Sequence, residues 1–90
     1  MGIRDFIEKL DEHRRRLAGG PSEAERAELL REAETMVGMI DAAVRELESV
    51  IKNRRLNLPE EHAVRFAQDV FRHLREGEER VKDQARGRDA

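Results

Sequence analysis

The sequence predicts an all-α protein: three helices in an up-down-up arrangement, built on a long antiparallel helical hairpin. In three stretches of the 90-residue chain, apolar residues recur at alternating steps of three and four, which places them on one side of a helix. Two breaks separate these stretches, the segment Gly19-Gly20-Pro21 and the residues before Pro59. We expect one helical domain over residues 1–82 that associates into a larger helical bundle.

The first helix is predicted over about residues 3–17. Its narrow apolar stripe consists of Ile3, Phe6, Ile7, Leu10 and Leu17. Three successive arginines, Arg14 to Arg16, lie near its carboxyl end, where positive charge interacts favourably with the helix dipole. The glycines and proline that follow end the helix.

The second helix is the longest, predicted over about residues 23–55, and Ser22 with Glu25 fits a capping box at its start. One apolar line along it consists of Leu30, Ala33, Val37, Ile40, Val44, Leu47 and Ile51. A second line consists of Leu29, Met36, Ala43 and Val50, with Met39 beside it. Together the lines cover roughly half of the helix circumference, so this helix needs at least two packing partners.

The third helix is predicted over about residues 59–81, with Pro59 at its first position, where the missing amide hydrogen costs nothing. Its predicted core line consists of Ala63, Ala67, Val70, Leu74, Gly77 and Val81. Residues 83–90 contain no apolar residue except alanine, and we expect a disordered polar tail there.

The apolar lines of the second and third helices match in antiparallel register. The predicted pairs are Ile51 with Ala63, Leu47 with Ala67, Val44 with Val70, Ile40 with Leu74, Val37 with Gly77, and Ala33 with Val81. The first helix is predicted to pair Ile3 with Val37, Ile7 with Ala33, and Leu10 with Leu30. It therefore covers only the amino-terminal half of the second helix. Gly77 should face the core, where close approach needs a small residue, and Gly38 should point outward.

Composition limits the possible functions. Eighteen Lys and Arg residues nearly balance twenty Asp and Glu residues, so the chain does not coat nucleic acid through bulk charge. The absence of cysteine excludes disulfides and thiolate chemistry. The amino terminus has no apolar run typical of a signal peptide or a membrane span. We expect a cytoplasmic protein without a membrane partner.

Few residues suggest chemistry. His62, Asp69 and His73 lie on one flank of the third helix and could approach a metal ion, but no HExxH or Glu-x-x-His pattern accompanies them. We expect them to be solvated. His13 is expected on the exposed end of the first helix, where it could act as a general base only if a pocket formed around it. We predict no catalytic residue, no metal site and no cofactor; a small helical enzyme or metal-binding bundle is one alternative.

A nucleic-acid-associated accessory subunit is a second alternative. The basic segments Arg14–Arg16 and Lys52–Arg55 could bind phosphates, although the predicted topology places them at opposite ends of the bundle. Residues 46–61, ELESVIKNRRLNLPEE, resemble the hairpin of the small subunit of exonuclease VII, a short helical accessory chain. The chain departs from that family by lacking its turn glycine and by having an additional amino-terminal helix, and no residue role is carried over.

The leading hypothesis is a non-enzymatic protein-protein interaction module, either a homodimer or a small subunit of a complex. The first helix is too short to reach the whole second line of the longest helix, so part of that surface is left for a partner. The predicted interface consists of Met36, Met39, Ala43, Val50, Val64 and Phe71. The competing interpretation is that the first helix covers these residues within the chain.

Overall fold

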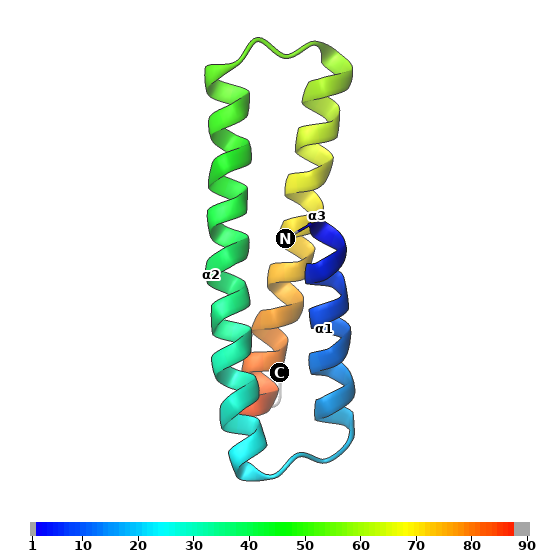
Figure 1. Cartoon of the computed structure of the whole chain (residues 1–90), viewed down its shortest axis with the longest axis vertical. Coiled ribbons are helices and arrows are strands. Elements are labelled where there is room, and N and C mark those ends of the chain that lie inside the picture. Colours follow the sequence, from blue (N-terminus) through cyan, green and yellow to red (C-terminus); the bar gives the residue numbers. More distant parts are fainter. Residues whose placement is uncertain (1, 88–90) are drawn as a thin grey trace.

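The structure, a computed structural model, describes residues 2–87 and confirms the all-α three-helix fold. The helices are α1 (Ile3–Ala18), α2 (Glu23–Asn53) and α3 (Leu58–Ala85). Helices α2 and α3 form a long hairpin, and α1 runs beside only its lower half (Figure 1). The molecule is an elongated rod with extents of 50 × 24 × 17 Å.

The first connection follows the sequence prediction closely. Helix α1 ends at Ala18, and Gly20 has a φ of 70°, a left-handed conformation that favours glycine. The Ser22 hydroxyl accepts a hydrogen bond from the Glu25 amide at 3.2 Å, which caps the start of α2. In a full capping box the Glu25 carboxylate would also accept a hydrogen bond from the Ser22 amide. Here it accepts one from the Ser22 hydroxyl instead.

Helix α3 is longer at both ends than the sequence pattern predicts. A capping box that the sequence analysis missed starts it at Leu58: Asn57 Oδ1 accepts from the Glu60 amide at 2.9 Å, and Glu60 Oε1 accepts from the Asn57 amide at 3.2 Å. At the other end the helix continues to Ala85. The prediction of a disordered tail is therefore wrong for residues 83–85, and residues 88–90 lie outside the described part of the chain.

Polar contacts across the hairpin confirm that α2 and α3 are antiparallel. Arg75 Nε donates to Asp41 Oδ1 at 2.8 Å, and Gln68 Nε2 donates to Glu48 Oε2 at 2.7 Å. The predicted register places residue 73 opposite Asp41 and residue 66 opposite Glu48. The observed partners, Arg75 and Gln68, each lie two residues further along α3, and their long side chains span this offset.

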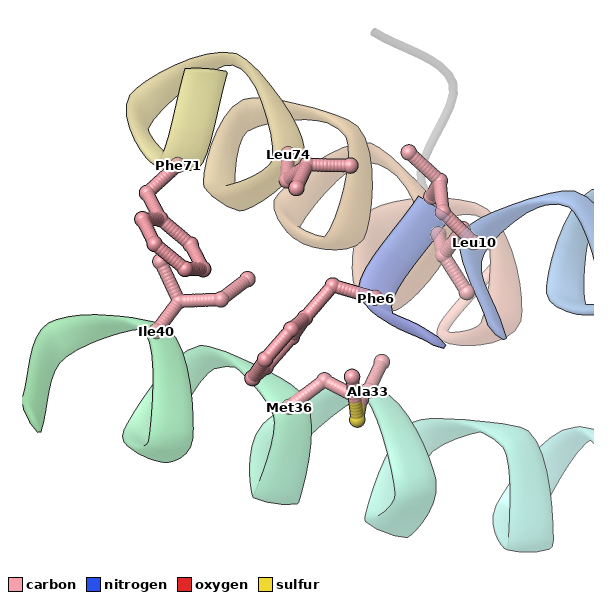
Figure 2. Packing of buried hydrophobic residues seen from close by; sticks show 8 residues of the cluster. Phe6, Leu10, Ala33, Met36, Ile40, Phe71 and Leu74 are labelled. Carbon is pink, nitrogen blue, oxygen red and sulfur yellow. The ribbon is translucent and has the colours of Figure 1, made fainter. Parts of the chain in front are cut away.

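The core lies where all three helices meet. Its buried cluster consists of Phe6, Leu10, Ala33, Met36, Ile40, Phe71, Leu74 and Val81. Figure 2 shows Phe6 of α1 directed between the two helices of the hairpin, toward Met36. The rings of Phe6 and Phe71 pack edge to face, with centroids 5.3 Å apart and an interplanar angle of 87°, a favourable aromatic geometry.

Helix α1 is rotated relative to the prediction and packs against α3 as well as α2. Phe6 meets Phe71 and, one heptad further along both helices, His13 meets Glu78, so α1 and α3 run parallel. Ile7, predicted to pair with Ala33, is 43% exposed. The predicted pairing of α1 with α2 alone is therefore wrong: α1 lies in the groove between two helices, and its buried face is centred on that groove.

Gly77 is buried, as predicted, but its neighbour is different. A Cβ atom at Gly77 would lie 2.6 Å from Leu10 Cδ2, so the missing side chain makes room for α1 and not for Val37 of α2. Gly38 points outward as predicted, with no atom within 4 Å of the position that a Cβ would occupy.

Candidate functional site

The hairpin continues well beyond the point where α1 begins. Phe6 packs against Met36 and Phe71, and α1 begins only three residues before Phe6. The upper part of the hairpin in Figure 1 therefore has no third helix against it.

The side chains that extend the path of α1 can be identified by helical spacing. On α2, Ala43 and Val50 lie one and two heptads past Met36, on the same side of the helix. On α3, Phe66 precedes Gly77 by three helical turns and so lies on the side that Leu10 contacts further along. We call this surface the distal groove; it consists of Met39, Ala43, Leu47, Val50, Ala63, Phe66, Ala67 and Val70.

The distal groove is apolar and only partly covered. Phe66 is 71% exposed and Met39 is 38% exposed, while Ala43, Leu47 and Val50 are half-buried. Ala63, predicted to lie in the hairpin core opposite Ile51, is exposed. That prediction is wrong because the line of α3 that carries Ala63 faces the α1 side of the hairpin, and α1 does not reach it.

The residues predicted as a partner interface separate into two groups. Met39, Ala43 and Val50 lie in the distal groove, and Val64 is half-buried next to it on α3. Met36 and Phe71 are only 4% and 7% exposed, because Phe6 covers both. The prediction that Met36 and Phe71 are exposed is therefore wrong. The alternative, that the first helix covers them within the chain, is correct for these two residues.

Phe66, the most exposed aromatic residue of the groove, was not among the residues predicted for the interface. Phe66 lies three helical turns from Gly77, on the same side of α3. The sequence would have indicated its position if Gly77 had been predicted to contact α1 and not α2.

The residues considered as metal ligands lie along the outer flank of α3. His62, Asp69 and His73 are all exposed. The Nδ1 atom of His73 lies 2.8 Å from the backbone oxygen of Asp69, and the Asp69 carboxylate pairs with Arg72 at 3.2 Å. Within residues 2–87, no three His, Asp or Glu side chains gather as a metal site requires.

His13 lies in the interior and not on an exposed end of α1, contrary to the prediction. Its Nδ1 atom is 2.7 Å from Glu78 Oε1, and the two side chains are 0% and 1% exposed. Each retains one buried atom without a hydrogen-bond partner, His13 Nε2 and Glu78 Oε2. Glu78 was not identified from the sequence, because it lies among several other charged residues of α3 and nothing in the pattern distinguishes it.

Next to this pair, α1 and α2 are separated by a cleft of about 290 Å³. It is lined by Lys9, His13, Arg31, Glu32, Thr35 and Met36. The cleft has a structural origin: Gly77 allows Leu10, and with it α1, to approach α3 closely, which leaves the α1–α2 side less tightly packed.

Ion pairs connect α1 to α2 at the edge of this cleft. Arg16 Nη1 donates to Glu32 Oε2 at 2.6 Å, and this hydrogen bond raises the pKa of Arg16 above its ordinary value. Lys9 Nζ lies 3.9 Å from Glu32 Oε1 of α2 and, within α1, 3.2 Å from Glu12 Oε2. The hydrogen bond and positive charge of Lys9 lower the pKa of the Glu12 carboxyl.

The two basic segments lie far apart. Arg14–Arg16 end α1 at the bottom of Figure 1, whereas Lys52–Arg55 lie at the hairpin turn at the top. They do not form one continuous basic surface. Among the described residues, no helix has a stretch long and apolar enough to cross a lipid bilayer. No protein-family model, curated protein or solved structure matches the chain.

Proposed function

We propose that this protein is a non-enzymatic assembly module that pairs with a second copy of itself through the distal groove. The observation that carries the proposal is the large apolar side chain of Phe66, 71% exposed, on the line of α3 that α1 covers elsewhere. Contiguous exposed apolar surface on a small domain is typical of a protein-protein contact. Two such hairpins face to face would make a four-helix bundle, which buries the apolar side chains of both.

The position of α1 determines how two copies can meet. Helix α1 forms a step on the lower half of the hairpin, about 10 Å high, which is the diameter of a helix. If two copies packed face to face with their long axes parallel, the α1 helix of one would meet the α1 helix of the other. Their distal grooves would then stay apart. A copy turned end for end can lie flat, with its hairpin turn beside the amino terminus of the other α1. A two-fold symmetric pair of this kind is closed and self-complementary.

The size of the distal groove predicts the strength of this dimer. From Met39 to Asn53, helix α2 extends about 21 Å at 1.5 Å per residue. Two helices side by side are about 20 Å wide, so the contact outlines about 400 Å² on each copy. Because side chains make the surface uneven, the area buried is larger than this outline. The total for both copies is of the order of 1,000 Å², the lower end for specific interfaces. We therefore expect a concentration-dependent dimer.

Sedimentation velocity over a range of protein concentrations tests the proposal. The wild type should approach twice the chain mass of 10.4 kDa at high micromolar concentration. The variant Phe66→Glu should stay monomeric, because it places a charge in the groove, and it should keep its helical circular dichroism because Phe66 has little intrachain contact.

Ser49→Glu is the matched control. It adds the same charge to the same half of the hairpin, on the outer side of α2, and should dimerise like the wild type. A wild type that stays monomeric at several hundred micromolar, or a Phe66→Glu variant that dimerises equally well, contradicts the proposal.

A further inference from the structure

We propose that the cleft between α1 and α2 binds a small carboxylate with a short apolar body. This site lies in the half of the molecule that α1 covers, away from the distal groove. It goes beyond the assembly role and does not depend on it.

The buried histidine supplies the first argument. Its Nδ1 atom is held by Glu78 of α3 at 2.7 Å. The other nitrogen, Nε2, lies on the opposite edge of the ring from the contact with Glu78, and His13 is one of the residues that line the cleft. Nε2 is buried and has no hydrogen-bond partner. A buried polar atom in this condition is stabilised by any ligand that supplies the missing partner.

The charges around the cleft select an anion. Lys9 and Arg31 both line it. Lys9 already pairs with Glu12 at 3.2 Å and with Glu32 at 3.9 Å, whereas Arg31 forms no ion pair within the described residues. The acid that lines the cleft, Glu32, is already bound by Arg16 at 2.6 Å. Glu32 and Lys9 are both already paired, so Arg31 is the lining charge that remains without a partner in the described residues, and it favours a carboxylate over a metal ion.

The bound arrangement satisfies the imidazole at both ends. When the ring carries a proton on each nitrogen, Nδ1–H donates to Glu78 and Nε2–H donates to the carboxylate of the ligand. The histidine then lies between two acids, Glu78 from α3 and the ligand, and Arg31 balances the added negative charge. Met36 supplies an apolar wall for the body of the ligand.

The volume of the cleft limits the size of the ligand. About 290 Å³ is at the lower end for ligand sites, which suits a short acid rather than a cofactor. The His13 ring is 0% exposed in the free protein, so a ligand reaches Nε2 only when a flexible lining side chain, Lys9 or Met36, changes rotamer.

Nuclear magnetic resonance of the histidine side chains tests the proposal. The chain has three histidines, and His62 and His73 are exposed, so they serve as internal references. The probes are benzoate and butyrate, each compared with its uncharged amide. The carboxylates should shift the ring nitrogen signals of His13 in a saturable way, toward the doubly protonated form, and leave the other two histidines nearly unchanged. The amides should produce no saturable shift.

Arg31→Met removes one cationic group from the cleft without changing the core. It should weaken carboxylate binding about tenfold, since a charge-assisted hydrogen bond is lost. Arg45→Met removes an exposed arginine elsewhere on α2 and should leave binding unchanged. Phe66→Glu should also bind the probes like the wild type, so failure here is separate from failure of the dimer.

Three outcomes would overturn the proposal. Shifts that rise linearly with probe concentration, shifts that are equal for acid and amide, or shifts shared by all three histidines would each mean that the cleft holds solvent only.

Discussion

Gly77 sets the distance between α1 and α3. A Cβ there would lie 2.6 Å from Leu10 Cδ2 and 3.2 Å from Leu10 Cδ1, closer than carbon atoms approach without a shift. Because Leu10 is buried, its side chain has little room to move away. One missing methyl group thus allows α1 to settle into its groove, and this in turn opens the cleft on the α2 side.

Alanine substitutions at two glycines test this assignment. Gly77→Ala should lower the free energy of unfolding by about 1 kcal/mol, because overpacking outweighs the gain in helix propensity. Gly38→Ala should be neutral or raise it by up to about 1 kcal/mol, since its Cβ meets no atom. Urea unfolding compares the two. A Gly77→Ala variant as stable as Gly38→Ala would show that α1 does not pack against this position.

The His13–Glu78 pair is the other single-residue feature that shapes the fold. A buried polar pair adds little net stability, but separating it leaves an uncompensated group in the interior. The pair lies one heptad beyond the contact of Phe6 with Phe71, and so fixes the parallel register of α1 on α3.

At the scale of the elements, the apolar periodicity predicts the number, order and approximate ends of the helices, because those depend on local spacing and on breaks such as Gly19-Gly20-Pro21. The rotation of α1 is not predictable in the same way. Its stripe contains both Phe6 and Ile7, and packing on α2 alone would bury Ile7. Only the presence of α3 on the other side of the groove favours burial of Phe6, Leu10 and His13 instead.

The ion pairs of α1 give the stability of the protein a pH dependence. The pKa of Glu12 is lowered from its ordinary value of 4.5, mainly by the hydrogen bond from Lys9. A carboxyl whose pKa is lower in the folded than in the unfolded state stabilises the folded state at any pH above its unfolded-state pKa. This stabilisation is lost as the pH falls through its folded-state pKa.

Glu12→Gln should therefore reduce stability at neutral pH, and the effect should disappear as the pH falls below 4.5 and through the lowered pKa of the Glu12 carboxyl. Because the Glu12 side chain is 43% exposed, the difference should be below about 1 kcal/mol. Chemical unfolding at several pH values measures it, and Asp11→Asn on the same helix is the matched control. A difference from the wild type that persists unchanged at pH 3 would contradict the Lys9–Glu12 contribution.

At the scale of the whole molecule, the decisive feature is the mismatch in length between α1 and the hairpin. The sequence predicts this mismatch, with helices over about residues 3–17 and 23–55, and in the structure α1 has 16 residues and α2 has 31. It also predicts part of the uncovered surface, namely Met39, Ala43 and Val50. It does not assign Phe66, Met36 and Phe71 correctly, because their exposure depends on which side of α3 the short helix occupies.

A distance between spin labels measures the direction in which two copies pair. The chain has no cysteine, so Arg55→Cys at the hairpin turn provides one labelling site per copy. In the end-for-end dimer the two turns lie at opposite ends of a contact about 21 Å long, so double electron-electron resonance should give about 20–30 Å between labels. The same label on Phe66→Glu should give no intermolecular distance. Two turns side by side at a helix-packing distance would give a label separation under about 15 Å. That result, or the absence of any intermolecular distance in the wild-type background, would rule out the end-for-end dimer.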